Sequence, residues 1–328
     1  MPLKYAVAAL ALSGVAHADT LIVGNKVEHT VSFIDLATGE EMARRDTGRA
    51  PHEVAVSPDG GLAVIVSYRE QNYTGNTLHV FDVETAEQIR VIDLGEHLGP
   101  HGLKWIPGTR EVIATTEVSE DVVIANVDTG EITGSIKTDQ QGTHMVTLSP
   151  DALRAYTGNI GSGSFSVLDL KTRTKIRDVK AGSQTEAVTV SPDGKEIWVG
   201  NNASQSIMIF DSETFEMTKE IRTEGIPIRV EMNPTGEYVA VSFPRLHKVV
   251  ILDTQSHEQV AEILMQTEGG LVPVTLLWSG DNKYLWAATT GGARVVEIAT
   301  ADWSLRRTLS AGSGSDGLGY SPLDVKVN

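Results

Sequence analysis

The sequence contains no cysteine among its 328 residues. This absence excludes disulfide bonds, thiolate metal ligands, a nucleophilic cysteine and covalent attachment of a c-type haem. The stability of the fold must therefore come from packing, and a chain of this length is long enough to bury a large core.

Basic residues are also scarce, with 27 Lys and Arg against 43 Asp and Glu and a formal net charge of −16. An acidic chain without a run of basic residues is repelled by phosphate backbones and by anionic lipids, so we expect no nucleic-acid partner. Long apolar runs are absent too. The run from Tyr5 to Val15 is too short to span a bilayer, so we expect no membrane insertion.

The first 18 residues have the three parts of an export signal. Lys4 supplies a positive charge, the apolar run follows, and Ala16-His17-Ala18 forms a small-x-small cleavage site. We therefore expect residues 1–18 to be a cleaved signal peptide and residues 19–328 to form a single domain. The expected location is the periplasm, or the medium after secretion, and the expected state is a monomer.

One motif repeats along the whole predicted mature chain. It is an apolar alternation that ends in Ser-Pro or a close variant, and consecutive copies are 42 to 49 residues apart. The copies lie at 52–58, 101–107, 144–150, 186–192, 228–234, 274–280 and 316–322. Most copies are followed by a turn such as Asp-Gly and then by further strand-like segments. This spacing is close to the roughly 40–45 residues of a four-stranded propeller blade.

The two ends of the chain are complementary. The N-terminal part has strand-like segments at 21–25, 30–35 and 41–48 without a preceding motif, whereas the C-terminal part ends on a lone motif. We therefore predict an all-β, seven-bladed β-propeller of four-stranded blades, with the ring closed by the N-terminal strands plus the C-terminal strand. We also expect the third strand of each blade to end in a turn-stabilising acid or amide, namely Asp35, Asp82, Asn126, Asp169, Asp211, Asp253 and Glu297.

The ends of three predicted second strands carry a family resemblance. The segments Ile22-Val23-Gly24-Asn25, Ala155–Asn159 and Ile197–Asn201 are similar to the Tyr-Val-Thr-Asn signature of YVTN-repeat propellers. The signature is replaced by Val66-Ser67-Tyr68 in one blade and by Ala287-Ala288-Thr289 in another. The resemblance implies the propeller fold. Members of this family include surface-layer proteins, lactonase-like enzymes and the propellers of periplasmic haem and copper oxidoreductases, so the resemblance does not select one function.

The residue at which each motif enters its first strand predicts a metal site. Around the ring these residues are His52, His101, His144, Glu186, Ile228, Val274 and Asp316. Three consecutive blades thus carry imidazoles that can converge on one ion at the channel mouth, with Asp316 or Glu186 as a further ligand or as a support for one. A Zn or Cu ion is expected, with Fe ranked after them. Periplasmic oxidoreductases with related propellers place histidines similarly, so the resemblance agrees with this interpretation.

Strand alternation supports a different interpretation of the histidines. His52 shares its parity with Val54, which must face the blade core, so the imidazoles would instead brace loops between blades. By the same parity Glu53 and Arg229 line the channel, where Arg229 could anchor an anion. If the protein is an enzyme, Glu53 and Glu186 are the candidate general bases.

Three functional hypotheses follow. The first and favoured one is a periplasmic protein that binds a transition metal or a metal-bound ligand at the channel mouth. The second is an enzyme at the same place, either a lactonase-like hydrolase or a copper- or haem-type oxidoreductase. The third is a platform for a periplasmic protein partner without small-molecule chemistry. Insertions are expected on the face of the histidines, at 69–76, 161–164 and 267–273.

Overall fold

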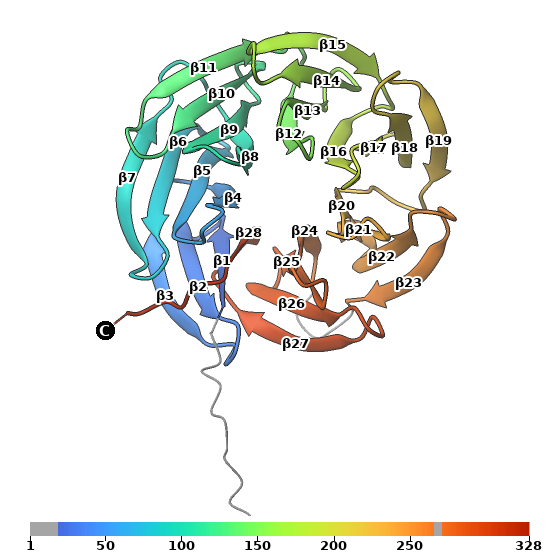
Figure 1. Cartoon of the computed structure of the whole chain (residues 1–328). Coiled ribbons are helices and arrows are strands. Elements are labelled where there is room, and N and C mark those ends of the chain that lie inside the picture. The colour runs from blue at the N-terminus through green and yellow to red at the C-terminus, as the bar shows by residue number, and fades with distance from the viewer. Residues whose placement is uncertain (1–18, 266–270, 328) are drawn as a thin grey trace, which may run out of the picture.

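Seven antiparallel four-stranded sheets form a ring in the computed structural model, which describes residues 19–265 and 271–327. Figure 1 shows the sheets arranged like blades around a central channel. The predicted seven-bladed propeller is therefore confirmed. The predicted signal peptide, residues 1–18, lies outside the described residues. No helix among the described residues is long and apolar enough to cross a membrane.

Each blade contributes one strand to each of four concentric layers. The innermost strands are β28 (Ser315–Ser321), β4 (Pro51–Val56), β8 (Pro100–Trp105), β12 (Thr143–Leu148), β16 (Thr185–Val190), β20 (Arg229–Met232) and β24 (Pro273–Trp278). The second strands are β1 (Thr20–Asn25), β5 (Leu62–Glu70), β9 (Glu111–Thr116), β13 (Arg154–Asn159), β17 (Glu196–Asn201), β21 (Tyr238–Phe243) and β25 (Tyr284–Thr289). The third strands are β2 (Thr30–Asp35), β6 (Tyr73–Asp82), β10 (Asp121–Asn126), β14 (Ser164–Asp169), β18 (Ser206–Asp211), β22 (Lys248–Asp253) and β26 (Arg294–Ala299). The outer strands are β3 (Glu41–Asp46), β7 (Glu87–Asp93), β11 (Ile132–Lys137), β15 (Thr174–Lys180), β19 (Met217–Arg222), β23 (Gln259–Leu264) and β27 (Leu305–Ser310). We number the blades 1 to 7 in this order, so that blade 1 combines β28 with β1–β3. The one helical element among residues 19–265 and 271–327 is a 3-10 turn, η1 (Pro244–Leu246).

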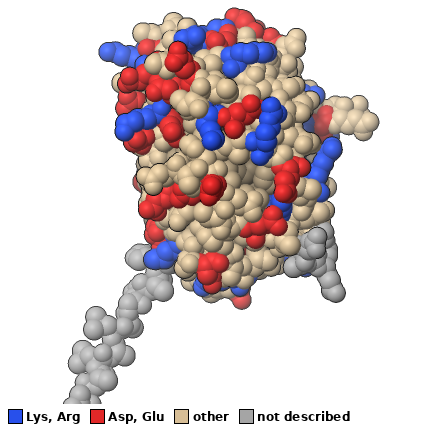
Figure 2. Space-filling view, turned by 90° about the vertical axis from the view of Figure 1, so that its right-hand side faces the viewer, with Lys and Arg blue, Asp and Glu red and all other residues tan. Residues whose placement is uncertain are grey.

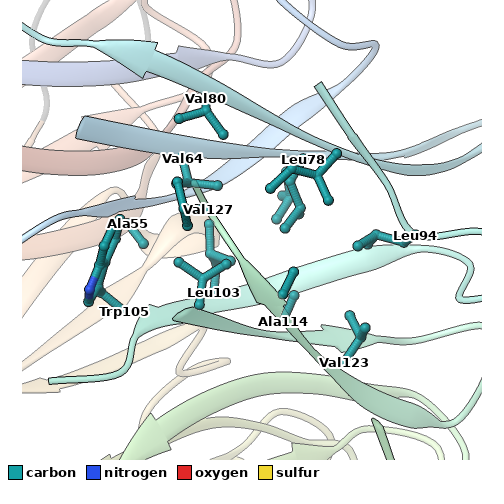
Figure 3. Packing of buried hydrophobic residues seen from close by; sticks show 14 residues of the cluster. Ala55, Val64, Leu78, Val80, Leu94, Leu103, Trp105, Ala114, Val123 and Val127 are labelled. Atoms are coloured by element: carbon teal, nitrogen blue, oxygen red, sulfur yellow. The ribbon is translucent and has the colours of Figure 1, made fainter. Parts of the chain in front are cut away.

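The hydrophobic core lies between neighbouring blades. Figure 3 shows one such layer, in which Val64 and Leu78 of blade 2 pack with Leu103 and Trp105 of blade 3. These side chains come from strands that alternate between the two faces of a sheet. Burying one of them stabilises the fold by about 1.5–3 kcal/mol. The outer strands are more exposed, and Figure 2 shows acidic and basic side chains interspersed over one side of the ring.

The ring closes as predicted, by pairing of the two chain ends. Strand β1 pairs with β28 in antiparallel register, with Thr20 opposite Ser321. The Tyr320 hydroxyl donates a hydrogen bond of 2.7 Å to the Asp19 carboxylate, and the Tyr320 ring stacks on Trp286 of blade 7. Because β1 and β28 pair with each other, neither chain terminus leaves an unpaired strand next to the channel.

The turn after the third strand follows the predicted pattern in six blades. Asp253, for example, accepts a hydrogen bond of 2.7 Å from the backbone N–H of Ser256. The prediction for Glu297 was wrong, because β26 ends at Ala299. Glu297 lies within that strand, is only 1% exposed and accepts hydrogen bonds from Trp286, Arg306 and Arg307.

Candidate functional site

A β-bulge near the start of the inner strand directs the histidines into the channel. In β4, Pro51 pairs with Ser67 and Val54 pairs with Ile65, so His52 and Glu53 together face the single residue Val66. The extra residue reverses the parity of the strand beyond it. His52 can therefore face the channel while Val54 packs in the core. The parity argument for loop bracing fails for this reason.

The same irregularity recurs around the ring. The ladder shifts between Pro100 and Leu103 in β8, between Thr143 and Val146 in β12, and likewise in β16, β24 and β28. The exception is β20, whose ladder begins at Arg229 and has no shift in register. Seven side chains, six of them at these bulges, thus surround the mouth of the channel, namely His52, His101, His144, Glu186, Ile228, Val274 and Asp316.

Glycines in the bulges allow the inner strands to approach one another. A Cβ atom at Gly102 would lie 2.7 Å from the carbonyl oxygen of His144, and one at Gly317 would overlap the carbonyl oxygen of His52. A side chain at either position would therefore push neighbouring blades apart. This close approach brings imidazoles from different blades into contact.

The seven side chains line a cavity of about 420 Å³. At these seven positions the wall is polar from blade 1 to blade 5, through Asp316, the three histidines and Glu186, and apolar in blades 6 and 7, through Ile228 and Val274, next to which Arg229, Thr275 and Thr290 also line the cavity. A cavity with an apolar side and a few converging polar groups is typical of a small-molecule site.

His52 and His101 form a close pair. Their Nε2 atoms are 3.1 Å apart, and both Nδ1 atoms are buried without a hydrogen-bond partner. Burial lowers the pKa of both imidazoles well below the usual value, so both are neutral. A neutral imidazole is the form that binds a metal ion. A buried polar atom without a partner costs stability, which indicates a role other than stabilising the fold.

His144 differs from this pair although its ring stacks on His101 at a centroid distance of 3.5 Å. Its Nδ1 donates to the Glu117 carboxylate at 2.9 Å, and its Nε2 lies 3.6 Å from a Glu186 carboxylate oxygen. Burial alone would lower its pKa, but the hydrogen bond that it donates to Glu117 and the negative charges of Glu117 and Glu186 raise the pKa to about 9. His144 is therefore a protonated imidazolium held between two acids. Glu186 is itself held by the Asn202 amide.

Asp316 completes the polar arc beside the pair. One carboxylate oxygen lies 3.5 Å from His52 Nε2 and 3.7 Å from Lys26 Nζ, and the other accepts from the Thr275 hydroxyl at 3.2 Å. Burial raises the pKa of Asp316 to about 6.

The floor of the cavity is an ion pair that crosses the channel. The Arg229 guanidinium of blade 6 donates to the Glu53 carboxylate of blade 2 and, at 3.1 Å, to the Thr275 hydroxyl. Burial would raise the pKa of Glu53, but Arg229 lowers it below the usual value. Both residues thus lie in the channel as predicted, and they neutralise each other there.

A second ring of side chains also contributes to the site, and the sequence interpretation missed it. The residue that directly follows the second strand lines the cavity in four blades, as Lys26, Glu117, Ile160 and Thr290, and Tyr68 lines it from within the longer strand β5. The signal was the departure from the family signature at Val66-Ser67-Tyr68. Reading this position around the ring would also have identified Glu117.

The predicted insertions have different outcomes. Residues 69–76 extend the β5–β6 hairpin beyond the six-residue strands of most blades, as expected. The insertion at 161–164 was wrong, because residues 160–163 form a turn as short as that of blade 1. The third expected insertion lies partly outside the described residues.

The fold and the cavity define a class, a seven-bladed propeller with a histidine-lined pocket at one end of its channel. Comparison with protein families places the chain within this class. Residues 69–240 and 110–312 match the model of the cytochrome D1 heme domain, and the chain belongs to that family. The match supports the predicted propeller but does not confirm the YVTN-repeat family.

Comparison with solved structures agrees on the fold. The propeller is similar to a chain of Kuenenia stuttgartiensis hydrazine synthase, with a TM-score of 0.76 and 20% sequence identity. The match covers 91% of this chain and 99% of that chain. No match was found among curated proteins.

Proposed function

We propose that this protein binds a haem non-covalently at the channel mouth, with the iron held by one imidazole of the His52–His101 pair. The observation that carries the proposal is the pair itself, two neutral imidazoles with unpartnered buried Nδ1 atoms at the wall of a cavity of about 420 Å³. The family to which the chain belongs is named for a haem domain. A haem bound there would supply a redox-active iron with a histidine ligand.

The other residues of the cavity fit the rest of a haem. Ile160, Ile228 and Val274 offer apolar contacts for a planar macrocycle. Lys26 lies at the rim with a side chain that is 32% exposed, where it can meet a carboxylate substituent. The lack of cysteine excludes covalent attachment and leaves axial ligation and packing to hold the group.

Iron replaces Zn or Cu as the proposed metal, because the comparisons give no support to the latter two. Single atoms of His52, Glu53 and His101 lie within 4.8 Å of one another, so these residues could also hold a bare ion. Glu53 is already paired with Arg229, however, which leaves two imidazoles for such an ion. A structural Zn site normally needs four ligands, and a catalytic site needs three.

The remaining polar residues take supporting roles in this proposal. His144 is held by Glu117 and Glu186 and presents a positive charge beside the pair, while Asp316 faces His52. Neither Glu53 nor Glu186 is free to act as a general base, so the proposed function is ligand binding. The proposal also includes export of the protein to the periplasm, where it would act as a monomer. Its partner there would be a small ligand or another protein. Amino-terminal sequencing of the periplasmic fraction should give Asp19 as the first residue, and an intact Met1 would contradict export.

The test is an absorption titration of the untagged protein with ferric haem. We expect stoichiometric binding to the wild type and a loss of more than about 100-fold in affinity for His52→Ala/His101→Ala. His247→Ala, which changes a histidine that does not line the cavity, is the matched control. Parallel titrations with Zn²⁺ and Cu²⁺ separate the alternatives. Tight binding of either ion without binding of haem would overturn the proposal.

A further inference from the structure

The extended hairpin of blade 2 places Tyr68 above the histidines. Its strands β5 and β6 have nine and ten residues, against six in the equivalent strands of blade 1. The β5–β6 ladder shifts between Ser67 and Arg69, so Gly75 and Asn76 of β6 form a bulge opposite Tyr68. Gly75 is part of this bulge, and a Cβ atom there would collide with the Ser67 carbonyl group. A bulge of this kind re-aims a side chain.

The hairpin is fastened to the neighbouring blade at several points. The Gly99 N–H donates to the Gly75 carbonyl at 2.8 Å, and the Arg69 guanidinium donates to Glu117 at 3.1 Å. On the other side, Arg49 pairs with Glu70. The hairpin is therefore a fixed part of the channel mouth.

The Tyr68 ring contacts all three imidazoles. Its centroid lies 4.6 Å from that of His101, 5.3 Å from that of His52 and 6.4 Å from that of His144, each with the rings nearly perpendicular. The Tyr68 hydroxyl donates to Glu117, the acid that also accepts from His144. Lys26 and Arg69 lie within 5.4 Å and 5.9 Å of the Tyr68 ring centroid.

The geometry points to Tyr68 as the specificity-determining residue of this site. Its ring shields the His52–His101 pair on the side of the hairpin, so that a ligand reaches the pair from across the channel, past Ile228 and Val274. The site then admits a planar, largely apolar ligand that enters along the apolar wall, and it disfavours ligands that approach from the hairpin. For haem as that ligand the inference rests on the proposed function, whereas the shielding itself is a property of the protein alone.

The first experiment measures access in the ligand-free protein. Diethyl pyrocarbonate acylates neutral imidazoles, and mass spectrometry gives the rate at His52 and His101. We expect Tyr68→Ala to raise this rate at least about tenfold, because the pair loses its cover. Tyr68→Phe keeps the ring and should stay within about twofold of the wild type. Tyr73→Ala is the matched control, because Tyr73 belongs to the same hairpin and contacts Arg49 and Ser67 instead.

Equal rates in wild type and Tyr68→Ala would overturn the inference, as would an equal rise in Tyr73→Ala, which would mean that the hairpin had merely loosened. If Tyr68→Ala does not fold, Tyr68→Leu replaces it.

The second experiment follows haem uptake by stopped flow, where Tyr68→Ala should associate about tenfold faster and Tyr68→Phe at the wild-type rate. Absence of haem binding by the wild type would contradict the proposed function, while the acylation rates would still decide whether Tyr68 shields the pair.

Discussion

The inner strands of blades 2 to 4 and those of blades 5 and 7 share one backbone irregularity but carry different side chains in it. The bulge of β12 holds His144 and that of β24 holds Val274. The backbone of the propeller therefore offers nearly every blade a position that faces the channel, and the chemistry depends on the residue placed there. Blades 2 to 4 use it for imidazoles, whereas blade 7 uses it for an apolar wall.

The largest effect is expected at the floor, where a bulge residue of blade 2 pairs with the inner strand of blade 6. Glu53→Ala leaves the buried Arg229 guanidinium without its carboxylate, which should lower the free energy of unfolding by about 3–5 kcal/mol. Urea denaturation measures this cost. The double variant Glu53→Met/Arg229→Met should recover much of it, and a cost below about 1 kcal/mol for the single variant would show that the pair is not part of the folded floor.

The bulge of β28 in blade 1, a bulge that carries no histidine, should not tolerate a larger residue in place of its glycine. Gly317→Ala forces a methyl group against the His52 carbonyl oxygen and should cost about 1–3 kcal/mol. Gly280→Ala is the control, because no atom lies within 4 Å of a Cβ atom at that position. Similar stabilities of the two variants in thermal unfolding would contradict the close approach of β28 and β4.

The buried acid of blade 7, Glu297, does not line the cavity. The contribution of Glu297 to the stability of the fold should depend on pH. Burial would raise the pKa of Glu297, but hydrogen bonds from Arg307 and Trp286 lower it below its ordinary value of 4.5. A lowered pKa in the folded state stabilises the protein above the unfolded value, and this contribution is lost as the pH falls through the folded value. Glu297→Gln should thus cost about 2 kcal/mol at pH 7 and progressively less below about pH 4. An equal loss of stability at pH 7 and below about pH 4, measured by urea denaturation, would show that the charge of Glu297 is not involved.

The smallest effect has the opposite sign. His52→Leu/His101→Leu removes both buried Nδ1 atoms that have no partner, together with both partners of the Nε2–Nε2 contact, so the ligand-free protein should become more stable by about 1 kcal/mol. The same variant should lose haem affinity. A clear loss of stability in chemical denaturation would indicate that the His52–His101 pair supports the fold rather than a ligand.

The fold could be predicted from the sequence because the repeat, the turn residues and the complementary ends all indicate the same architecture. The histidine positions could be predicted because they recur at one place in the motif. Their direction could not, since a bulge is a pairing relation between two strands and His52 has the parity of Val54 in the sequence. The pairing of Glu53 with Arg229 was equally hidden, because the two residues meet only across the closed ring.

The contribution of Tyr68 and Glu117 was missed for a different reason. Tyr68 lies within the second strand β5 and Glu117 directly follows the second strand β9, where the sequence pattern indicates the family signature and not which side chains face the channel. Their positions repeat around the ring just as the histidine positions do. Glu297 illustrates the converse error, in which a repeat position was extended to a blade whose third strand ends in Ala299.

The structure of the protein with bound haem tests the central claim most directly. The account predicts iron within bonding distance of an imidazole nitrogen of His52 or His101, with Ile228 and Val274 against the macrocycle and the Glu53–Arg229 pair intact below it. Haem bound at the opposite face, or iron without a histidine ligand from blades 2 and 3, would contradict the account.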